Sequence, residues 1–253
     1  MSWQLYQYIC LVWMALGLAT FFYLLRVQAP FGRHVRAGWG PTINNRLGWV
    51  LMELTVLIVL YLVFFNSRQS GSLTTPMLVM LGLFTAHYVH RSLIFPQFLR
   101  TRGKRMPLII ALSAMGFNCM NGFLFGYFFG RFADYPAEWL SDFRFQSGFA
   151  IFLSGAAINV YTDYKLIGLR KPGDTGYKIP QGGLFNYLSC PNHFGEIMEW
   201  IGFAVLSWSL PGLAFAFWTF ANLAPRALAH HRWYQEQFPE YPAGRKAVLP
   251  FFW

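Results

Sequence analysis

Residues 47–65 read LGWVLMELTVLIVLYLVFF, an apolar run that decides the class of the protein. Its length fits the ~20 residues that a helix needs to cross the hydrocarbon core of a bilayer. The apolar side chains are continuous and do not alternate with polar ones, so the run predicts a spanning helix and not a strand of a membrane barrel. The run contains one charged side chain, Glu53.

Similar runs recur along the whole chain. Of the 253 residues, 55% are hydrophobic and only 12% are charged, whereas soluble domains carry about 25% charged residues. So few charges cannot cover an ordinary water-facing surface. We therefore predict an all-α, polytopic membrane protein with seven transmembrane helices. The predicted spans are 5–25, 47–65, 77–95, 108–129, 145–161, 194–209 and 213–230, with 209–212 as the turn between the last two.

The first run could be a secretory signal, but no basic segment precedes it and no small-residue cleavage site lies before Arg26. We predict a retained span. The three cysteines, Cys10, Cys119 and Cys190, lie in or beside apolar runs without metal-binding spacing. This pattern predicts small packing residues and no disulfide framework.

The net charge of +10 comes from 20 Lys and Arg against 10 Asp and Glu. A soluble protein of this charge could bind nucleic acid, but in a membrane protein it indicates the positive-inside rule and attraction to anionic lipids. We predict no nucleic acid partner. Connections after the first, third and fifth runs are rich in cations. This alternation predicts an external N-terminus and a cytosolic C-terminus, in a bacterial inner membrane or, in a eukaryote, the endoplasmic reticulum.

Charged groups inside a bilayer are costly, so each is a functional candidate. Glu53 is either a catalytic or ligand-binding group or a structural carboxylate paired with a neighbouring helix. The third run ends in HYVHR, where His87, His90 and Arg91 share a helical face. That cluster is also typical of an interfacial aromatic belt with a snorkelling Arg.

Three further polar sets fall toward the basic side of the predicted membrane. Two carboxylates on one span cannot face lipid, so they predict a polar cavity or ion-pair partners. The sets are Asn192, Glu196 and Glu199; Asn159 and Asp163; and Arg226, His230 and Tyr234.

The loop 169–183 reads LRKPGDTGYKIPQGG and could bring N–H groups and cations to phosphates. A plain surface loop can have the same composition, and neither a Walker loop nor GxGxxG is present. His230 and His231 point about 100° apart on a helix, and His87 and His90 have no carboxylate at ligand spacing. We therefore predict no metal.

Taken together, these motifs resemble the steroid 5α-reductase family, the membrane 3-oxo-5α-steroid 4-dehydrogenases. The strongest matches are residues 169–173 (LRKPG), 177–185 (YKIPQGGLF) and 195–202 (GEIMEWIG). Residues 29–32, 87–91, 159–163, 245–247 and 250–253 and the segment around Glu53 also fit.

The resemblance implies a single reductase domain in which residues 5–129 mainly form a steroid pocket and 145–253 mainly bind NADPH on the cytosolic side. Glu53 and Tyr88 resemble the catalytic pair that bonds the substrate's 3-oxo group. Met52 departs from the Gln that the family often has before this Glu, which bears on steroid recognition. The positions that match family cofactor-binding residues are Arg91, Lys104, Asn159, Asp163, Arg170, Tyr177, Asn192, Glu196, Arg226, His230 and Tyr234.

The implied reaction is NADPH-dependent reduction of the Δ4 double bond of 3-oxo-Δ4 steroids to 5α-3-oxosteroids. Hydride added at C5 pushes negative charge onto the ketone oxygen, and a Tyr or protonated Glu donating there stabilises the transition state. We expect a monomer whose partners are a steroid-like lipid and membrane lipids.

Three alternatives stay open at this point. A polyprenol or enoyl-thioester reductase shares the C-terminal pattern. An isoprenylcysteine-type membrane methyltransferase has a similar Pro-Asn helix, but SCPNH at 189–193 departs from its Arg-His-Pro-Asn-Tyr form and Glu53 has no role there. A lipid carrier or transporter is the third. Protection against thermal unfolding by NADPH or by S-adenosylmethionine separates the first two classes.

Overall fold

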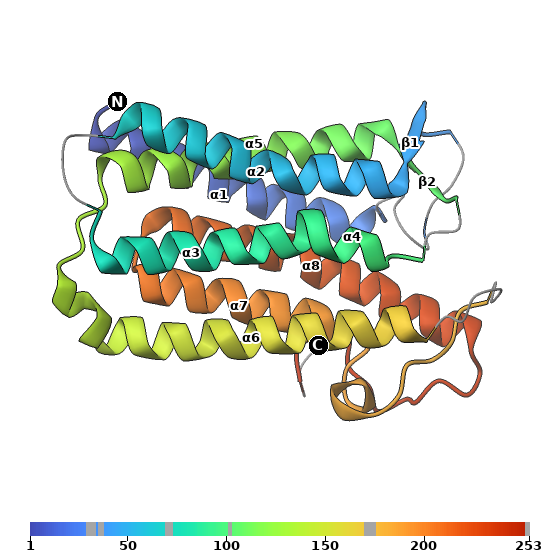
Figure 1. Cartoon of the computed structure of the whole chain (residues 1–253). Coiled ribbons are helices and arrows are strands. Elements are labelled where there is room, and N and C mark those ends of the chain that lie inside the picture. The colour runs from blue at the N-terminus through green and yellow to red at the C-terminus, as the bar shows by residue number, and fades with distance from the viewer. Residues whose placement is uncertain (29–33, 35–37, 69–72, 101–102, 170–175, 251–253) are drawn as a thin grey trace. The chain divides into compact units, whose positions relative to one another are not determined.

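The computed structural model describes the chain apart from residues 29–33, 35–37, 69–72, 101–102, 170–175 and 251–253, and most of the described part is helical (Figure 1). The long helices are α1 (Trp3–Arg26), α2 (Asn45–Ser67), α3 (Thr75–Val89), α5 (Leu108–Arg131), α6 (Phe143–Gly168), α7 (Pro191–Ser207) and α8 (Leu210–Gln237). The short elements are β1 (Thr42–Asn44), the π-helix η2 (His90–Ile94), α4 (Phe95–Phe98), β2 (Arg105–Pro107) and the 3-10 helices η3 (Ala137–Ser141) and η4 (Gly183–Asn186).

Each of the seven apolar runs is helical over most of its length. Among the residues that the structure describes, four helical stretches are long and apolar enough to cross a bilayer: Trp3–Arg26, Asn45–Ser67, Thr75–Phe98 and Leu108–Arg131. These stretches make the chain an integral membrane protein. Helices α6, α7 and α8 occupy the other three runs without meeting that standard, so seven spans stay a prediction.

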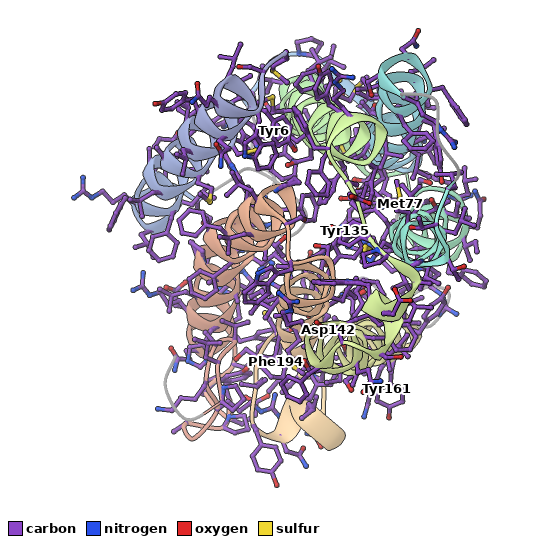
Figure 2. All side chains as sticks on the ribbon, turned by 90° about the vertical axis from the view of Figure 1, so that its left-hand side faces the viewer. Tyr6, Met77, Tyr135, Asp142, Tyr161 and Phe194 are labelled. Atoms are coloured by element: carbon purple, nitrogen blue, oxygen red, sulfur yellow. The ribbon has the colours of Figure 1, made fainter. Side chains whose placement is uncertain are left out.

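The outer face of α2 is apolar, as a lipid-facing helix requires. Leu51, Ile58, Leu62 and Phe65 lie on one side of this helix, and all four are exposed. Soluble proteins rarely leave such a row of large apolar side chains in water. Figure 2 shows a further outward-pointing side chain, that of Tyr161 on α6, which is 63% exposed.

The chain divides into two compact units, each of which has its own interior. Unit 1 comprises Met1–Cys10, Ala29–Gln146 and Ser209–Pro211, and unit 2 comprises Leu11–Gln28, Ser147–Trp208 and Gly212–Trp253. The predicted division of labour between a substrate-binding N-terminal part and a cofactor-binding C-terminal part stays a prediction.

In unit 1, α2 and α5 lie side by side and run in the same direction (Figure 1). A Cβ added to Gly122 of α5 would lie 2.7 Å from the Val56 carbonyl oxygen, and one added to Gly126 would lie 2.5 Å from that of Leu60. Side chains larger than hydrogen do not fit at such distances. Glycine therefore lets the two backbones touch, as in membrane helix pairs generally.

The predicted helical class is confirmed, and one short antiparallel pair of strands, β1 and β2, accompanies the helices, with Ile43 opposite Met106. β1 leads directly into α2 and β2 into α5, so the pair holds the N-terminal ends of both helices together. The Asn44 side chain caps α2 by accepting from the N–H groups of Arg46 (3.0 Å) and Leu47 (3.1 Å). Strands of three residues are too short to show a period of two in the sequence.

In unit 2, α6 and α7 run antiparallel and touch through four glycines, Gly148 and Gly155 on α6 and Gly195 and Gly202 on α7. A Cβ on Gly155 would lie 2.3 Å from the Glu199 nitrogen, and one on Gly195 would lie 2.5 Å from the Asn159 nitrogen. The glycines thus bring the polar ends of the two helices into hydrogen-bonding range.

The connection between α7 and α8 is tighter than the predicted turn at 209–212. Trp208 ends α7 in the left-handed conformation, with φ of 41°, and α8 begins at Leu210. Pro211 and Gly212 lie in the first turn of α8, where proline is favoured because that turn needs no N–H donor from it. The turn prediction was therefore wrong by about two residues.

Candidate functional site

Both residues predicted to act on the substrate lie in unit 1. Glu53 is half-buried on α2, and Tyr88 is buried in the last turn of α3. The Tyr88 ring packs against those of Phe84 and His87, with centroids 4.9 and 5.0 Å away. The phenol therefore sits in an aromatic setting at the end of a spanning helix.

The helix carrying Tyr88 does not continue regularly to residue 95, as the sequence predicted, but widens into the π-turn η2. Pro96 accounts for this, because proline lacks an N–H and clashes with the carbonyl four residues before it. In the wider turn, the Phe95 N–H donates to the carbonyl of His90, five residues earlier. The wider turn begins at His90, so the predicted common face of His87, His90 and Arg91 stays a prediction.

The π-turn makes the Arg91 carbonyl available to another helix. Trp49 of α2 donates to it through Nε1 at 3.0 Å. The Arg91 guanidinium lies over the rings of Trp49 (5.4 Å) and Phe95 (4.8 Å). Trp49 is one helical turn before Glu53 and on the same face of α2. The bond thus links the turn before Glu53 to the turn after Tyr88.

A second hydrogen bond joins α2 to α3 on the other side of Glu53 and Tyr88. The Tyr61 hydroxyl lies 2.6 Å from Thr85 Oγ1, which in turn lies 2.6 Å from the Leu81 carbonyl. The single threonine proton goes to Leu81, so the phenol is the donor to Thr85. Tyr61 is about two turns after Glu53, and Thr85 is about one turn before Tyr88, so two bonds bracket the predicted catalytic pair.

In unit 2, four of the predicted cofactor-binding residues form one hydrogen-bonded cluster. Asn159 Nδ2 donates to the Asn192 carbonyl (3.0 Å) and to Glu196 Oε2 (3.4 Å). Asn192 Nδ2 donates to Asp163 Oδ1 at 2.9 Å. Asn159 and Asp163 on α6 are buried, whereas Asn192 and Glu196 on α7 are half-buried. Asn192 and Glu196 of α7 therefore face polar partners, and not lipid.

Other candidates of unit 2 lie on the segments around this cluster. Tyr177 packs on Trp233 of α8 at 4.9 Å, and the His230 ring lies 5.9 Å from that of His193, the neighbour of Asn192. Arg226 is half-buried on α8, and Tyr234 is buried and stacks on Tyr241 at 5.2 Å. Lys165, which was not predicted, follows Asp163 on α6 and donates through Nζ to the Gly182 carbonyl at 3.1 Å.

A buried polar chain holds the C-terminal segment against the start of α7. Ser189 Oγ lies 2.6 Å from both His231 Nδ1 and the Tyr241 hydroxyl. The Ser189 N–H donates to the Lys246 carbonyl at 2.8 Å. Burial lowers the pKa of His231, and the charges of Lys246 and Arg232 lower it further. The sequence did not predict this set of hydrogen bonds, because the residues that make it are far apart in the sequence and none is an acid.

The unit 2 cluster fits the polar groups of a dinucleotide. Carboxylates accept from ribose hydroxyls, and the Asn side chains both donate and accept. Arg170, the predicted phosphate ligand, lies outside the described residues. Arg91 and Lys104 belong to unit 1, where Lys104 is exposed immediately before β2. Within the part of the chain that the structure describes, no group of three His, Cys, Asp or Glu is placed to hold a metal ion.

Comparison with known proteins decides the family. Residues 104–253 match the family model described as 3-oxo-5-alpha-steroid 4-dehydrogenase. The chain is 43% identical to human 3-oxo-5-alpha-steroid 4-dehydrogenase 1, over 94% of this chain and 91% of that protein. It is 43% identical to the steroid 5-alpha-reductase DET2 of Gossypium hirsutum, over 98% of each chain. The chain belongs to the 3-oxo-5-alpha-steroid 4-dehydrogenase family.

The family resemblance drawn from the sequence is thereby confirmed, and the protein is an oxidoreductase. A third relative, 3-oxo-5-alpha-steroid 4-dehydrogenase 2 of Sus scrofa, is 46% identical over 81% of this chain and 80% of its own. The part of the present chain that matches the family model includes Lys104 and every candidate of unit 2. Glu53, Tyr88 and Arg91 precede the matched range, so the roles predicted for them stay predictions.

Proposed function

We propose that the protein reduces the Δ4 double bond of 3-oxo-Δ4 steroids to give 5α-3-oxosteroids, with NADPH as the reductant. The observation that carries this proposal is the 43% identity, over nearly the whole of both chains, to enzymes named for this activity. The bracketed Glu53–Tyr88 pair and the polar cluster of unit 2 supply the two kinds of group that such a reaction needs.

Glu53 and Tyr88 polarise the substrate's 3-oxo group in this proposal. NADPH, when bound, supplies the hydride that reaches C5 of the steroid. As the C5–H bond forms, the enone electrons move to the 3-oxo oxygen. The Tyr88 hydroxyl and a protonated Glu53 donate hydrogen bonds to that oxygen and stabilise its negative charge. A proton from water then adds at C4, which restores the ketone.

The unit 2 cluster binds the cofactor in this proposal. Asn159, Asp163, Asn192 and Glu196 hold its hydroxyl and amide groups through the acceptors and donors described above. Charge-assisted bonds contribute about 1.5–3 kcal/mol each, so cations on the extra phosphate favour NADPH over NADH. The other proposed cofactor ligands are Tyr177, Arg226, His230 and Tyr234, with Arg91, Lys104 and Arg170.

The test combines product analysis with cofactor titration. Purified protein is given NADPH and a panel of 3-oxo-Δ4 steroids, a polyprenol and an enoyl thioester, and the products are identified by mass and by the configuration at C5. We expect 5α-3-oxosteroids, and roughly 10- to 1000-fold tighter binding of NADPH than of NADH. Reduction of only the non-steroid lipids, or thermal protection by S-adenosylmethionine and not by NADPH, contradicts the proposal.

A further inference from the structure

Asn118 makes a hydrogen bond from α5 to the backbone of α2 beside Glu53. Its side chain is 4% exposed, and Nδ2 donates to the Met52 carbonyl at 2.6 Å. Met52 directly precedes Glu53 in the chain. A helix carbonyl has a second lone pair, so it can accept this bond in addition to the one within its own helix.

The bond lies at one end of the close contact between α2 and α5. Asn118 is one turn before Gly122 on the same face of α5, and Gly122 touches the backbone at Val56. At the level of Met52, α5 presents the Asn118 amide to α2, whereas one turn later it presents only the hydrogen atom of Gly122. The distance and the rotation of α2 against α5 at that level are therefore set by the amide–carbonyl bond.

The rotation of α2 decides where Glu53 points. The buried Met52 side chain and its carbonyl belong to the side of α2 that packs on α5. Successive residues of a helix point about 100° apart, so fixing Met52 on α5 turns Glu53 to the adjacent side. Trp49, on that adjacent side, bonds the π-turn beyond Tyr88. The carboxyl is thus held from two directions.

We infer that Asn118 is a positioning residue for Glu53, which orients the carboxyl toward the substrate oxygen through the Met52 carbonyl. This inference rests on the proposed function of Glu53. Small displacements of a catalytic group lower rates by up to about 100-fold, so loss of the bond acts on the reduction step. It leaves the cofactor cluster of unit 2 unchanged.

The experiment is a double-mutant cycle on single-turnover steroid reduction. Asn118→Leu keeps a similar volume without a donor, and we expect it to lower the rate about 10- to 100-fold. In a Glu53→Ala background it should lower the rate no further, because the group it positions is gone. The dissociation constant of NADPH should stay unchanged in both backgrounds. Asn118→Ala enters the same cycle with the same expectation, so that a misfolded Leu variant does not decide the result.

Asn121 provides the matched control, because it is buried on the same helix and donates to the Phe117 carbonyl of that helix at 2.9 Å. Any effect of Asn121→Leu should be equally large with and without Glu53. A full effect of Asn118→Leu in the Glu53→Ala background, or a wild-type rate for Asn118→Leu, overturns the positioning role alone. A wild-type rate for Glu53→Ala overturns the proposed function of Glu53, and this inference falls with it.

Discussion

Neighbouring groups fix both the backbone and the ring of Tyr88. The buried Ser92 side chain donates to the Tyr88 carbonyl at 2.6 Å, and the π-turn begins two residues after Tyr88. Its ring is packed between aromatic neighbours, so the phenol has few rotamers to sample. Glu53 is more open but is bracketed on α2. Residues fixed in this way suit a role that depends on direction.

The first prediction concerns the proposed catalytic pair. Tyr88→Phe removes one hydrogen bond to the developing oxyanion, which costs about 100- to 1000-fold in rate where such a donor has been removed. Glu53→Gln keeps the shape and one donor and should be milder than Glu53→Ala. The measurement is single-turnover reduction of a 3-oxo-Δ4 steroid, alongside an NADPH titration that should change little.

Tyr8→Phe is the control for this series, because Tyr8 is 66% exposed on α1 and the change again removes one phenolic hydroxyl. It should reduce the steroid at the wild-type rate. Near wild-type rates for Glu53→Ala and Tyr88→Phe, or failure caused only by loss of NADPH binding, would show that the pair does not act on the carbonyl.

At this scale the sequence identified charged residues better than neutral ones. A lone carboxyl in an apolar run, such as Glu53, is conspicuous because lipid cannot solvate it. Trp49 and Asn118 are neutral, so nothing in the sequence of their apolar runs marks them as functional. Their partners are backbone carbonyls of other helices, which a sequence cannot specify before the helices are packed.

Among the elements, the pairing of α6 with α7 matters most for the proposed cofactor site. Their glycines let the backbones touch, and the cluster of Asn159, Asp163, Asn192 and Glu196 lies at the end of that contact. These hydrogen bonds form only when the two helices are close together. A side chain that pushes the helices apart should therefore break or lengthen them.

Gly195→Ala tests this dependence. The added methyl would lie 2.5 Å from the Asn159 nitrogen, so α6 and α7 must move apart. Overpacking of this kind typically costs about 1–3 kcal/mol, and we expect a lower Tm together with weaker NADPH binding. Both are measured by thermal unfolding with increasing NADPH.

Gly116→Ala serves as the comparison, because a Cβ at this position of α5 meets nothing within 4 Å. Alanine is favoured over glycine in helices by about 0.5–1 kcal/mol, so the Tm should stay level or rise. If Gly195→Ala binds NADPH as tightly as Gly116→Ala does, the close contact is not needed for the cofactor.

The helices themselves could be predicted from the sequence, because apolar runs of spanning length leave few alternatives. The interruptions could not. The π-turn depends on how Pro96 is accommodated, and a plain helix end at that proline was equally compatible with the sequence. The left-handed Trp208 is an unusual conformation for a bulky residue, so turn propensities pointed instead to Pro211 and Gly212.

For the whole molecule, the direction of the helices bears on orientation in the membrane. α2 and α5 run parallel in unit 1, and their starts are joined by the β1–β2 pair. Exposed cations gather around those starts, namely Arg46, Arg100, Lys104 and Arg105. The positive-inside rule assigns such an end to the cytosol.

We therefore predict a cytosolic C-terminus for this protein, as the alternating charges of its connections also predict. A fluorescent reporter that folds only in the cytosol, fused after Trp253, should fluoresce. An enzyme reporter that works only outside the cytosol should be inactive at the same position. The reverse pattern in a stably expressed fusion would invert the topology and remove the proposed cofactor residues from the cytosolic side.

The π-turn after Tyr88 makes the protein sensitive to chain length at that point. A π-turn, closed here by the bond from the Phe95 N–H to the His90 carbonyl, contains one residue more than an α-helical turn closed between residues 95 and 91. Deleting one residue from 90–94 would allow an unbroken helix to reach the proline, with Tyr88 still in place. The narrower turn would shift the Arg91 carbonyl that receives the Trp49 indole. A one-residue gap here would therefore weaken the Trp49 link between α2 and this turn, while the Tyr61–Thr85 bond still joins α2 to α3 and both proposed catalytic side chains stay present.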